Sequence, residues 1–93
     1  MISSALWSPS EKAELPGQGA VLRHVAIKAD YVATRHHHDH EQFLFVASGH
    51  GRLTCEQGTI DLVPGTALHL AAGDWHSAEF TADTVLIEVN LRD

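Results

Sequence analysis

The chain has 93 residues with twelve acidic and six basic side chains, and its formal charge of −6 argues against a nucleic-acid partner. No apolar run approaches the roughly 20 residues that cross a bilayer, which argues against a membrane partner. The single cysteine, Cys55, excludes an internal disulfide, and the N-terminus lacks the pattern of a secretory signal, so we expect a cytoplasmic protein.

The length predicts one small domain. A chain of this size buries only about 60–65% of the surface that its unfolded form exposes, so its stability is marginal. Pairing with a second copy would bury more surface, and we expect a homodimer on that ground. The apolar fraction of 44% is typical of a globular domain.

Residues 1–19 form the first segment. They hold two of the three prolines and two of the seven glycines, which predicts a partly extended N-terminal arm with one short strand around residues 5–7. Such an arm needs something to pack against, and a dimer partner is one candidate. Residues 20–93 form the folded domain.

From residue 20 the pattern is one of short strands and tight turns. We expect eight strands, at residues 21–28, 31–38, 42–47, 52–56, 59–63, 67–70, 76–80 and 84–91. Three turns are expected between them, at residues 48–51 (SGHG), at Gln57-Gly58 and at Pro64-Gly65. We find no eleven-residue window with helical periodicity. The fold class is therefore all-β, a sandwich or barrel with little or no helix.

Four side chains in this pattern are suited to binding a metal. His36 and His38 alternate on a predicted strand and so share one face. Gln42 opens the following strand, and His76 opens another strand 34 residues later. If folding brings them together, three imidazoles and one amide oxygen converge on a divalent ion.

The region around the first histidines resembles the first sequence motif of the cupin family, G-x5-H-x-H-x3–4-E-x6-G. Here His36-x-His38-x3-Gln42-x6-Gly49 matches at the metal positions, and glutamine stands for the glutamate, as it does in many family members. Asp30 occupies the position of the first glycine. The resemblance implies that His36, His38 and Gln42 are metal ligands.

The second cupin motif, G-x5-P-x-G-x2-H-x3-N, is similar to Gly65-x5-Ala71-x-Gly73-x2-His76-x3-Phe80. Ala71 replaces the proline and Phe80 the asparagine, and neither is a ligand position. The resemblance covers nearly the whole chain beyond the arm. It implies a small single-domain jelly-roll β-barrel of the RmlC-like, Cupin_2 type, with His76 as the remaining ligand.

The fourth ligand is open between two neighbours. Glu41 is the alternative oxygen donor, and the amide of Gln42 is a weaker ligand, but strand parity favours Gln42 because Glu41 points to the opposite face. With Gln42 the donor set is neutral, so a bound ion keeps its full +2 charge and polarises an anionic substrate more strongly. Imidazole-rich sites suit Zn, Ni, Fe and Cu, with Mn as a further option.

A reaction would also need a group that transfers protons. His40, Glu41 and Glu79 are the candidates near the predicted ligands, and spacing favours none of them. Trp75 either lines the mouth of the barrel or packs at its rim.

Three functions fit these residues. The first is a metal-dependent isomerase, lyase or dioxygenase acting on a small polar or anionic molecule such as a sugar acid. In cupins that resemble this chain, a site of three histidines and a glutamine occurs in enzymes that open unsaturated sugar acids. The second is a non-catalytic binding or sensor module, and the third is a cupin in which the metal is structural.

Overall fold

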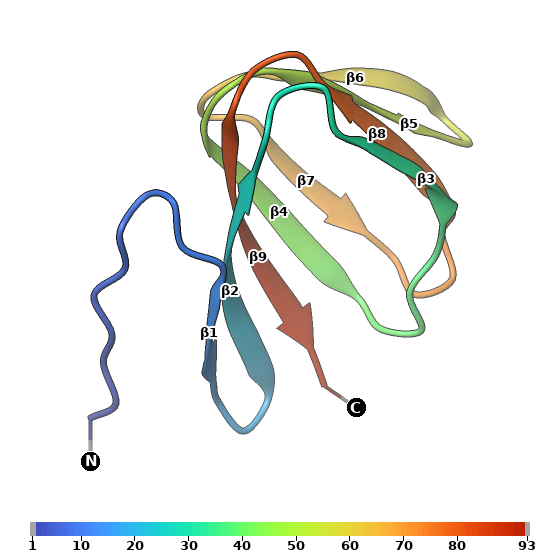
Figure 1. The fold of residues 1–93 in the computed structure, drawn as a ribbon. Coiled ribbons are helices and arrows are strands. Elements are labelled where there is room, and N and C mark those ends of the chain that lie inside the picture. The colour runs from blue at the N-terminus through green and yellow to red at the C-terminus, as the bar shows by residue number, and fades with distance from the viewer. Residues whose placement is uncertain (1, 93) are drawn as a thin grey trace.

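The structure is a computed structural model, and it describes residues 2–92. Nine strands make up its regular secondary structure, and these residues contain no helix (Figure 1). The described residues therefore include no helix that is long and apolar enough to cross a membrane. The strands are β1 (Ala13–Pro16), β2 (Ala20–Ile27), β3 (Val32–His36), β4 (Gln42–Ser48), β5 (Gly51–Cys55), β6 (Gly58–Leu62), β7 (Ala67–Leu70), β8 (His76–Phe80) and β9 (Thr84–Leu91).

The strands form two antiparallel sheets that face each other. Sheet A has the order β1-β2-β9-β4-β7, and sheet B has the order β3-β8-β5-β6. Strands far apart in the sequence lie side by side: β9 lies between β2 and β4, and β3 pairs with β8 (Figure 1). This arrangement confirms the predicted all-β jelly roll.

The core fills the space between the sheets. Alternate residues of β4 point inward, and Val46 is only 1% exposed. The other buried apolar side chains come from both sheets and include Val25, Leu44, Leu53, Leu62, Leu70, Phe80 and Leu86.

All eight predicted strands are present; three have the predicted ends, and the ends of the other five differ by one or two residues. The largest difference concerns the strand predicted at 31–38, because β3 ends at His36 and His38 follows it. The arm also differs: its strand is Ala13–Pro16, which pairs with β2, and the predicted strand at residues 5–7 is absent.

Candidate metal centre

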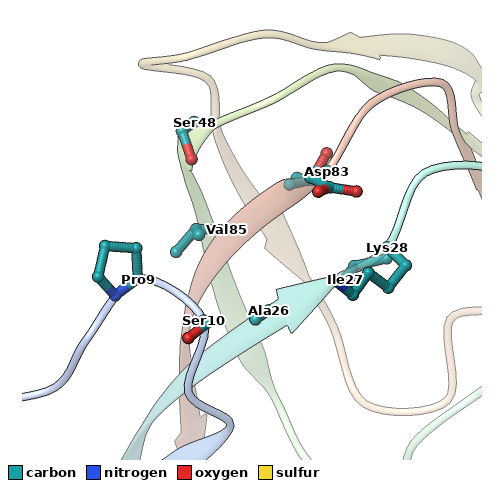
Figure 2. A pocket seen from close by; sticks show the side chains of 9 residues that line it. Pro9, Ser10, Ala26, Ile27, Lys28, Ser48, Asp83 and Val85 are labelled. Carbon is teal, nitrogen blue, oxygen red and sulfur yellow. The ribbon is translucent and has the colours of Figure 1, made fainter.

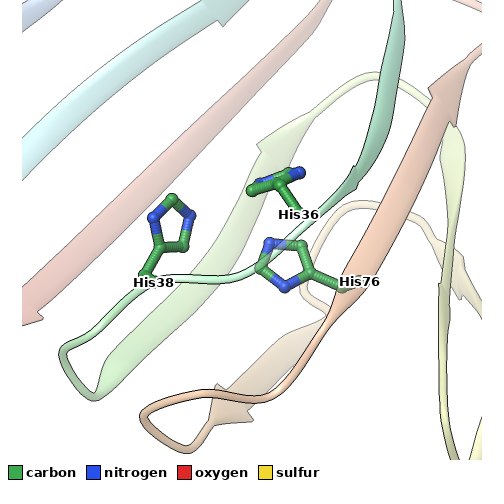
Figure 3. A group of neighbouring side chains, drawn as sticks. All are labelled: His36, His38 and His76. Carbon is green, nitrogen blue, oxygen red and sulfur yellow. The ribbon is translucent and has the colours of Figure 1, made fainter.

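Three histidines from two segments meet at one end of the barrel. His36 ends β3, His38 lies two residues later, and His76 opens β8 directly opposite His36. Their rings face a common space, and one ring nitrogen from each lies within 4.8 Å of the others (Figure 3). The structure therefore brings together the three imidazoles that the sequence singled out.

A bulge in β3 aims His36 inward. The register between β3 and β8 shifts between Ala33 and His36, so both residues line the interior although simple alternation would put them on opposite faces. His38 follows the strand and lines the same cavity. The common face of His36 and His38 was predicted for the wrong reason, since they do not alternate on one strand.

Hydrogen bonds fix the orientation of two of the rings. Nδ1 of His36 lies 2.7 Å from the carbonyl oxygen of Thr34, and Nδ1 of His76 lies 3.4 Å from that of Asp74. A carbonyl only accepts, so each Nδ1 carries the proton and donates it. The Nε2 lone pair of each ring is then free to bind a metal.

Two of the rings, those of His38 and His76, have pKa values shifted toward the neutral form that metal binding requires. Burial lowers the pKa of His38 and of His76, because a charged imidazolium loses hydration inside the barrel. The neighbouring His36 lowers both pKa values further by charge repulsion. A site that disfavours protons in this way loses little affinity to proton competition at neutral pH.

Gln42 lies inside the barrel with the three histidines, and Glu41 lies outside. The Gln42 side chain is 4% exposed and lines the same cavity, and its amide Nε2 donates to Oδ1 of Asn90 at 3.2 Å. That bond leaves the Gln42 oxygen free. Glu41 pairs instead with His69, across the outer face of sheet A.

These donors fit a divalent first-row transition ion. Three neutral imidazole nitrogens and an amide oxygen are of the ligand type that Zn, Ni, Fe, Cu and Mn accept. The Gln42 amide is already oriented by Asn90, so the oxygen side is preorganised as well. Of the two candidate oxygen donors, Gln42 lines the cavity with the imidazoles and Glu41 does not.

The cavity beside the histidines has a volume of about 110 Å³, enough for a small molecule or a few waters. Its polar wall consists of His36, His38, His76, Gln42 and Glu88, and the rest is apolar and aromatic. Polar groups that converge at the edge of an apolar pocket are typical of ligand and active sites.

Glu88 is the residue that sequence reasoning missed. It lies on the inward face of β9, two residues before Asn90, and lines the cavity. Burial raises its pKa, although Arg23, whose Nη1 lies 3.2 Å from its Oε1, acts in the opposite direction. A carboxyl group with a raised pKa in a pocket is a candidate for proton transfer.

The titration of these groups predicts how the metal-free protein responds to acid. The folded-state pKa values of His38 and His76 are lowered, so below the unfolded value of about 6.5 the unfolded chain binds more protons. Stability should therefore fall as the pH is lowered from 7.5 to 5.5. Denaturant melts of metal-free protein across this range would measure it.

Two variants separate the contributions of the histidines and of Glu88 to this pH dependence of stability. His76→Asn should flatten the acid-induced loss of stability. Glu88 changes the stability in the opposite direction. Its folded-state pKa is raised, so the stability that it contributes is lost as the pH rises through that pKa. Glu88→Gln should therefore steepen the acid-induced loss of stability. A metal-free protein whose stability is constant or rises toward pH 5.5 would contradict the assignment of neutral, buried imidazoles.

The model of the cupin domain (Cupin_2) matches residues 23–90, which is most of the chain. The chain belongs to the cupin family. A search of curated proteins finds no match.

Solved structures agree on the fold of this cupin. A cupin protein from Bacteroides fragilis is 17% identical with a TM-score of 0.84, over 97% of this chain and 83% of that one. KdgF from Halomonas sp. is 21% identical with a TM-score of 0.76, over 88% and 80%. A sugar phosphate isomerase from Silicibacter pomeroyi is 21% identical with a TM-score of 0.67, over 82% of this chain and 52% of that one.

The departures of this cupin from the family motifs have physical explanations. Asp30, in place of a glycine, has φ 69°, which aspartate tolerates better than most residues. Ala71, in place of proline, uses its N–H to donate to Oδ2 of Asp74 at 3.2 Å. Phe80, in place of asparagine, is buried in the core and lines the cavity.

The three proton-transfer candidates named from the sequence lie in different places. Glu41 is paired with His69 on the outer face of sheet A, and Glu79 lies on the outer face of sheet B beside Arg52. The ring of His40 lies 5.2 Å from that of His38, tilted against it, and its Nε2 is buried and unpaired, but His40 does not line the cavity. Trp75 packs at the rim, 4.0 Å from the Arg35 guanidinium.

Proposed function

We propose that this cupin is a divalent-metal-dependent enzyme of the isomerase, lyase or dioxygenase type, acting on a small anionic molecule such as a sugar acid. The observation that carries the proposal is the shared cavity: the three converging imidazoles and a largely buried carboxyl group with a raised pKa line the same small pocket. A structural metal site needs the imidazoles but has no use for such a carboxyl group.

The proposed ligands are His36, His38, His76 and Gln42. When bound, the ion supplies Lewis-acid polarisation of a substrate oxygen or activation of a bound oxygen species. The four donors are neutral, so an anionic group is attracted to the full +2 charge. The apolar wall of the cavity limits access of water to the reacting atoms.

Glu88 is the proposed proton-transfer group. As a carboxylate it would take a proton from the substrate, and as a carboxylic acid it would return that proton at a neighbouring atom. Arg23 fixes the position of the Glu88 carboxyl and favours its charged form, while burial favours its neutral form.

Glu88→Gln tests this role. The amide cannot exchange the proton, so we expect turnover to fall by about 10²- to 10⁴-fold while metal content stays at the wild-type value. Glu79→Gln is the matched control, because Glu79 lies on an outer face. Wild-type turnover in the Glu88 variant, or equal losses in both variants, would remove Glu88 from the mechanism.

The substrate screen should begin with unsaturated uronates and sugar phosphates, followed by diketones and catechols. The sugar phosphate isomerase among the similar structures motivates the second group. Turnover that requires added metal and disappears in His36→Ala would support an enzyme. Saturable binding of one of these compounds without any product would instead favour the alternative of a sensor or binding module.

We further propose a reducing compartment such as the cytoplasm. Cys55 is a free, partly buried thiol beside the strand that carries His76, where oxidation would disturb the site.

A further inference from the structure

The cavity beside the histidines has a polar end and an apolar end. The polar end consists of the three imidazoles, the Gln42 amide and the Glu88 carboxyl. On each of β4, β8 and β9, the cavity-lining residue two positions further from the histidines is apolar. Alternate residues of a strand share one face, so the polar and apolar residues form one continuous wall. The pairs are Gln42 and Leu44, His76 and Ala78, and Glu88 and Leu86.

Two alanines leave room at the apolar end. Ala33 on β3 and Ala78 on β8 are partners in the strand register, and both line the cavity. Beyond them Phe80, which is buried, closes the space together with Tyr31, whose ring lies 6.4 Å from that of Phe80. A larger side chain at either alanine would occupy part of the cavity. The two alanines therefore set the size of the group that fits there.

An apolar group suits this end of the cavity better than water or a hydroxyl group does. Water finds few hydrogen-bond partners among aliphatic and aromatic side chains, and apolar cavities stay dry. The volume is about 110 Å³, and since an apolar cavity of about 150 Å³ holds benzene, about four non-hydrogen atoms fit. A hydroxyl group placed there would lose its hydrogen bonds to water and gain none.

A larger cleft lies apart from these residues. It has a volume of about 350 Å³ and lies between the arm and sheet A, where Pro9 and Ser10 border it together with Ala26 and Val85 (Figure 2). None of the proposed metal-binding residues lines it. The smaller cavity is therefore the one that shapes a molecule bound at the imidazoles.

We propose that the substrate of this site is a small anionic molecule with an apolar body of about four non-hydrogen atoms, which lies against Ala33 and Ala78 while its anionic group lies at the polar end. This inference rests on the proposed function and narrows its substrate class. A branched aliphatic carboxylate fits both ends of the cavity, so it ranks above a fully hydroxylated sugar acid. Ala33 and Ala78 are the specificity-determining residues.

Two matched probes test the substrate class by binding alone. 3-Methylbutanoate and 3-hydroxybutanoate share a carboxylate and differ in one group, a methyl in place of a hydroxyl. We expect zinc-loaded protein to bind 3-methylbutanoate at least about tenfold more tightly, because a hydroxyl buried at the apolar end is left without a partner. Chelation of the ion by the hydroxyl acts in the opposite direction and cannot produce this preference. Amide chemical shifts followed by NMR give both dissociation constants.

The same spectra locate the bound probe. We expect the largest shifts at Ala33 and Ala78. Equal affinity of the two probes, tighter binding of 3-hydroxybutanoate, or no saturable binding of 3-methylbutanoate at about 50 mM would overturn the inference. Shifts confined to Ala26 and Val85 would place the probe in the larger cleft and would overturn it as well.

This test is separate from the test of the enzyme. If 3-methylbutanoate is preferred and the substrate screen gives no turnover, the specificity stands and belongs to a binding protein. If a sugar acid is turned over and 3-methylbutanoate is not preferred, the enzyme stands and the specificity proposed for Ala33 and Ala78 is wrong.

Ala78→Leu tests the role of the alanines. The added side chain fills the apolar end, so 3-methylbutanoate should bind at least about tenfold more weakly. Acetate, which lacks the apolar body, should bind as it does to the wild type, and zinc content should not change. Ser77→Leu is the matched control, because Ser77 is adjacent on β8 but lies on the outer face of sheet B.

Ala33→Leu adds the same bulk from the facing strand, so a folding defect in one variant, detected by circular dichroism, does not decide the result. The alanines would have no part in recognition if either folded variant bound 3-methylbutanoate with wild-type affinity. Equal weakening of acetate binding, or an equal effect of Ser77→Leu, would lead to the same conclusion.

Discussion

Replacing His76 with alanine is expected to lower metal affinity by more than about a hundredfold, which exceeds the ten- to hundredfold loss typical of an outer hydrogen-bond partner of a ligand. His76 is buried at the centre of the cluster, and its ring lies 4.3 Å from that of His36. Its removal leaves two imidazoles and an amide. Competition titration with a chromophoric chelator, on protein without a histidine tag, measures the change.

His37→Ala is the matched control for this experiment. His37 lies between two proposed ligands in the sequence, yet its side chain is 61% exposed and approaches Asp39 instead of the cluster. Its loss should leave metal affinity within about twofold of wild type, since a solvated histidine contributes no bond to the ion. If His37→Ala and His76→Ala weakened binding equally, the ion would be held by the histidine-rich segment at large and not by the cavity site.

Gly49→Ala should destabilise the protein by about 2–5 kcal/mol. Gly49 has φ 101°, where an L side chain costs about 1–2 kcal/mol. A Cβ there would also lie 2.3 Å from Oγ1 and 2.5 Å from Cα of Thr84, and overpacking of this kind adds about 1–3 kcal/mol. Urea unfolding followed by tryptophan fluorescence gives the free energy of unfolding.

Gly58→Ala separates the two costs. Gly58 also has a positive φ, 124°, but a Cβ there would meet nothing within 4 Å. It should therefore show only the backbone cost of about 1–2 kcal/mol. Equal destabilisation by both substitutions would mean that contact with Thr84 is unimportant, and that the last glycine of the first cupin motif is needed only for its backbone conformation.

The strands could be predicted from the sequence because turn residues separate them sharply. The glycines at 49, 58 and 65 all adopt positive φ, as turn composition implies, and each lies in a connection or at its edge. The bulge in β3 could not be predicted, because alternation of side chains gives no sign of an inserted residue. That bulge decides which way His36 points.

The inward face of β9 is the main reason that Glu88 was missed. Along this strand Val85, Ile87 and Val89 alternate with Leu86, Glu88 and Asn90, so the more apolar set points outward in the monomer. Hydrophobic alternation alone would orient the strand the other way.

The residues of the candidate metal site were easier to predict than Glu88, the proposed proton-transfer group, because they lie in two short motifs with fixed spacing. Strand parity predicted that Gln42 faces the interior and Glu41 the exterior, and in the structure Gln42 lines the cavity whereas Glu41 does not. The location of the arm could not be predicted, since residues 2–12 contain no strand and their packing depends on single contacts such as that of Trp7 with His24.

Anomalous diffraction from a crystal of tag-free, metal-loaded protein tests the central claim most directly. We predict one strong peak per chain, bonded to Nε2 of His36, His38 and His76 and to the amide oxygen of Gln42. A peak at another place, a carboxylate of Glu41 in the coordination sphere, or no bound ion at saturating metal would contradict it.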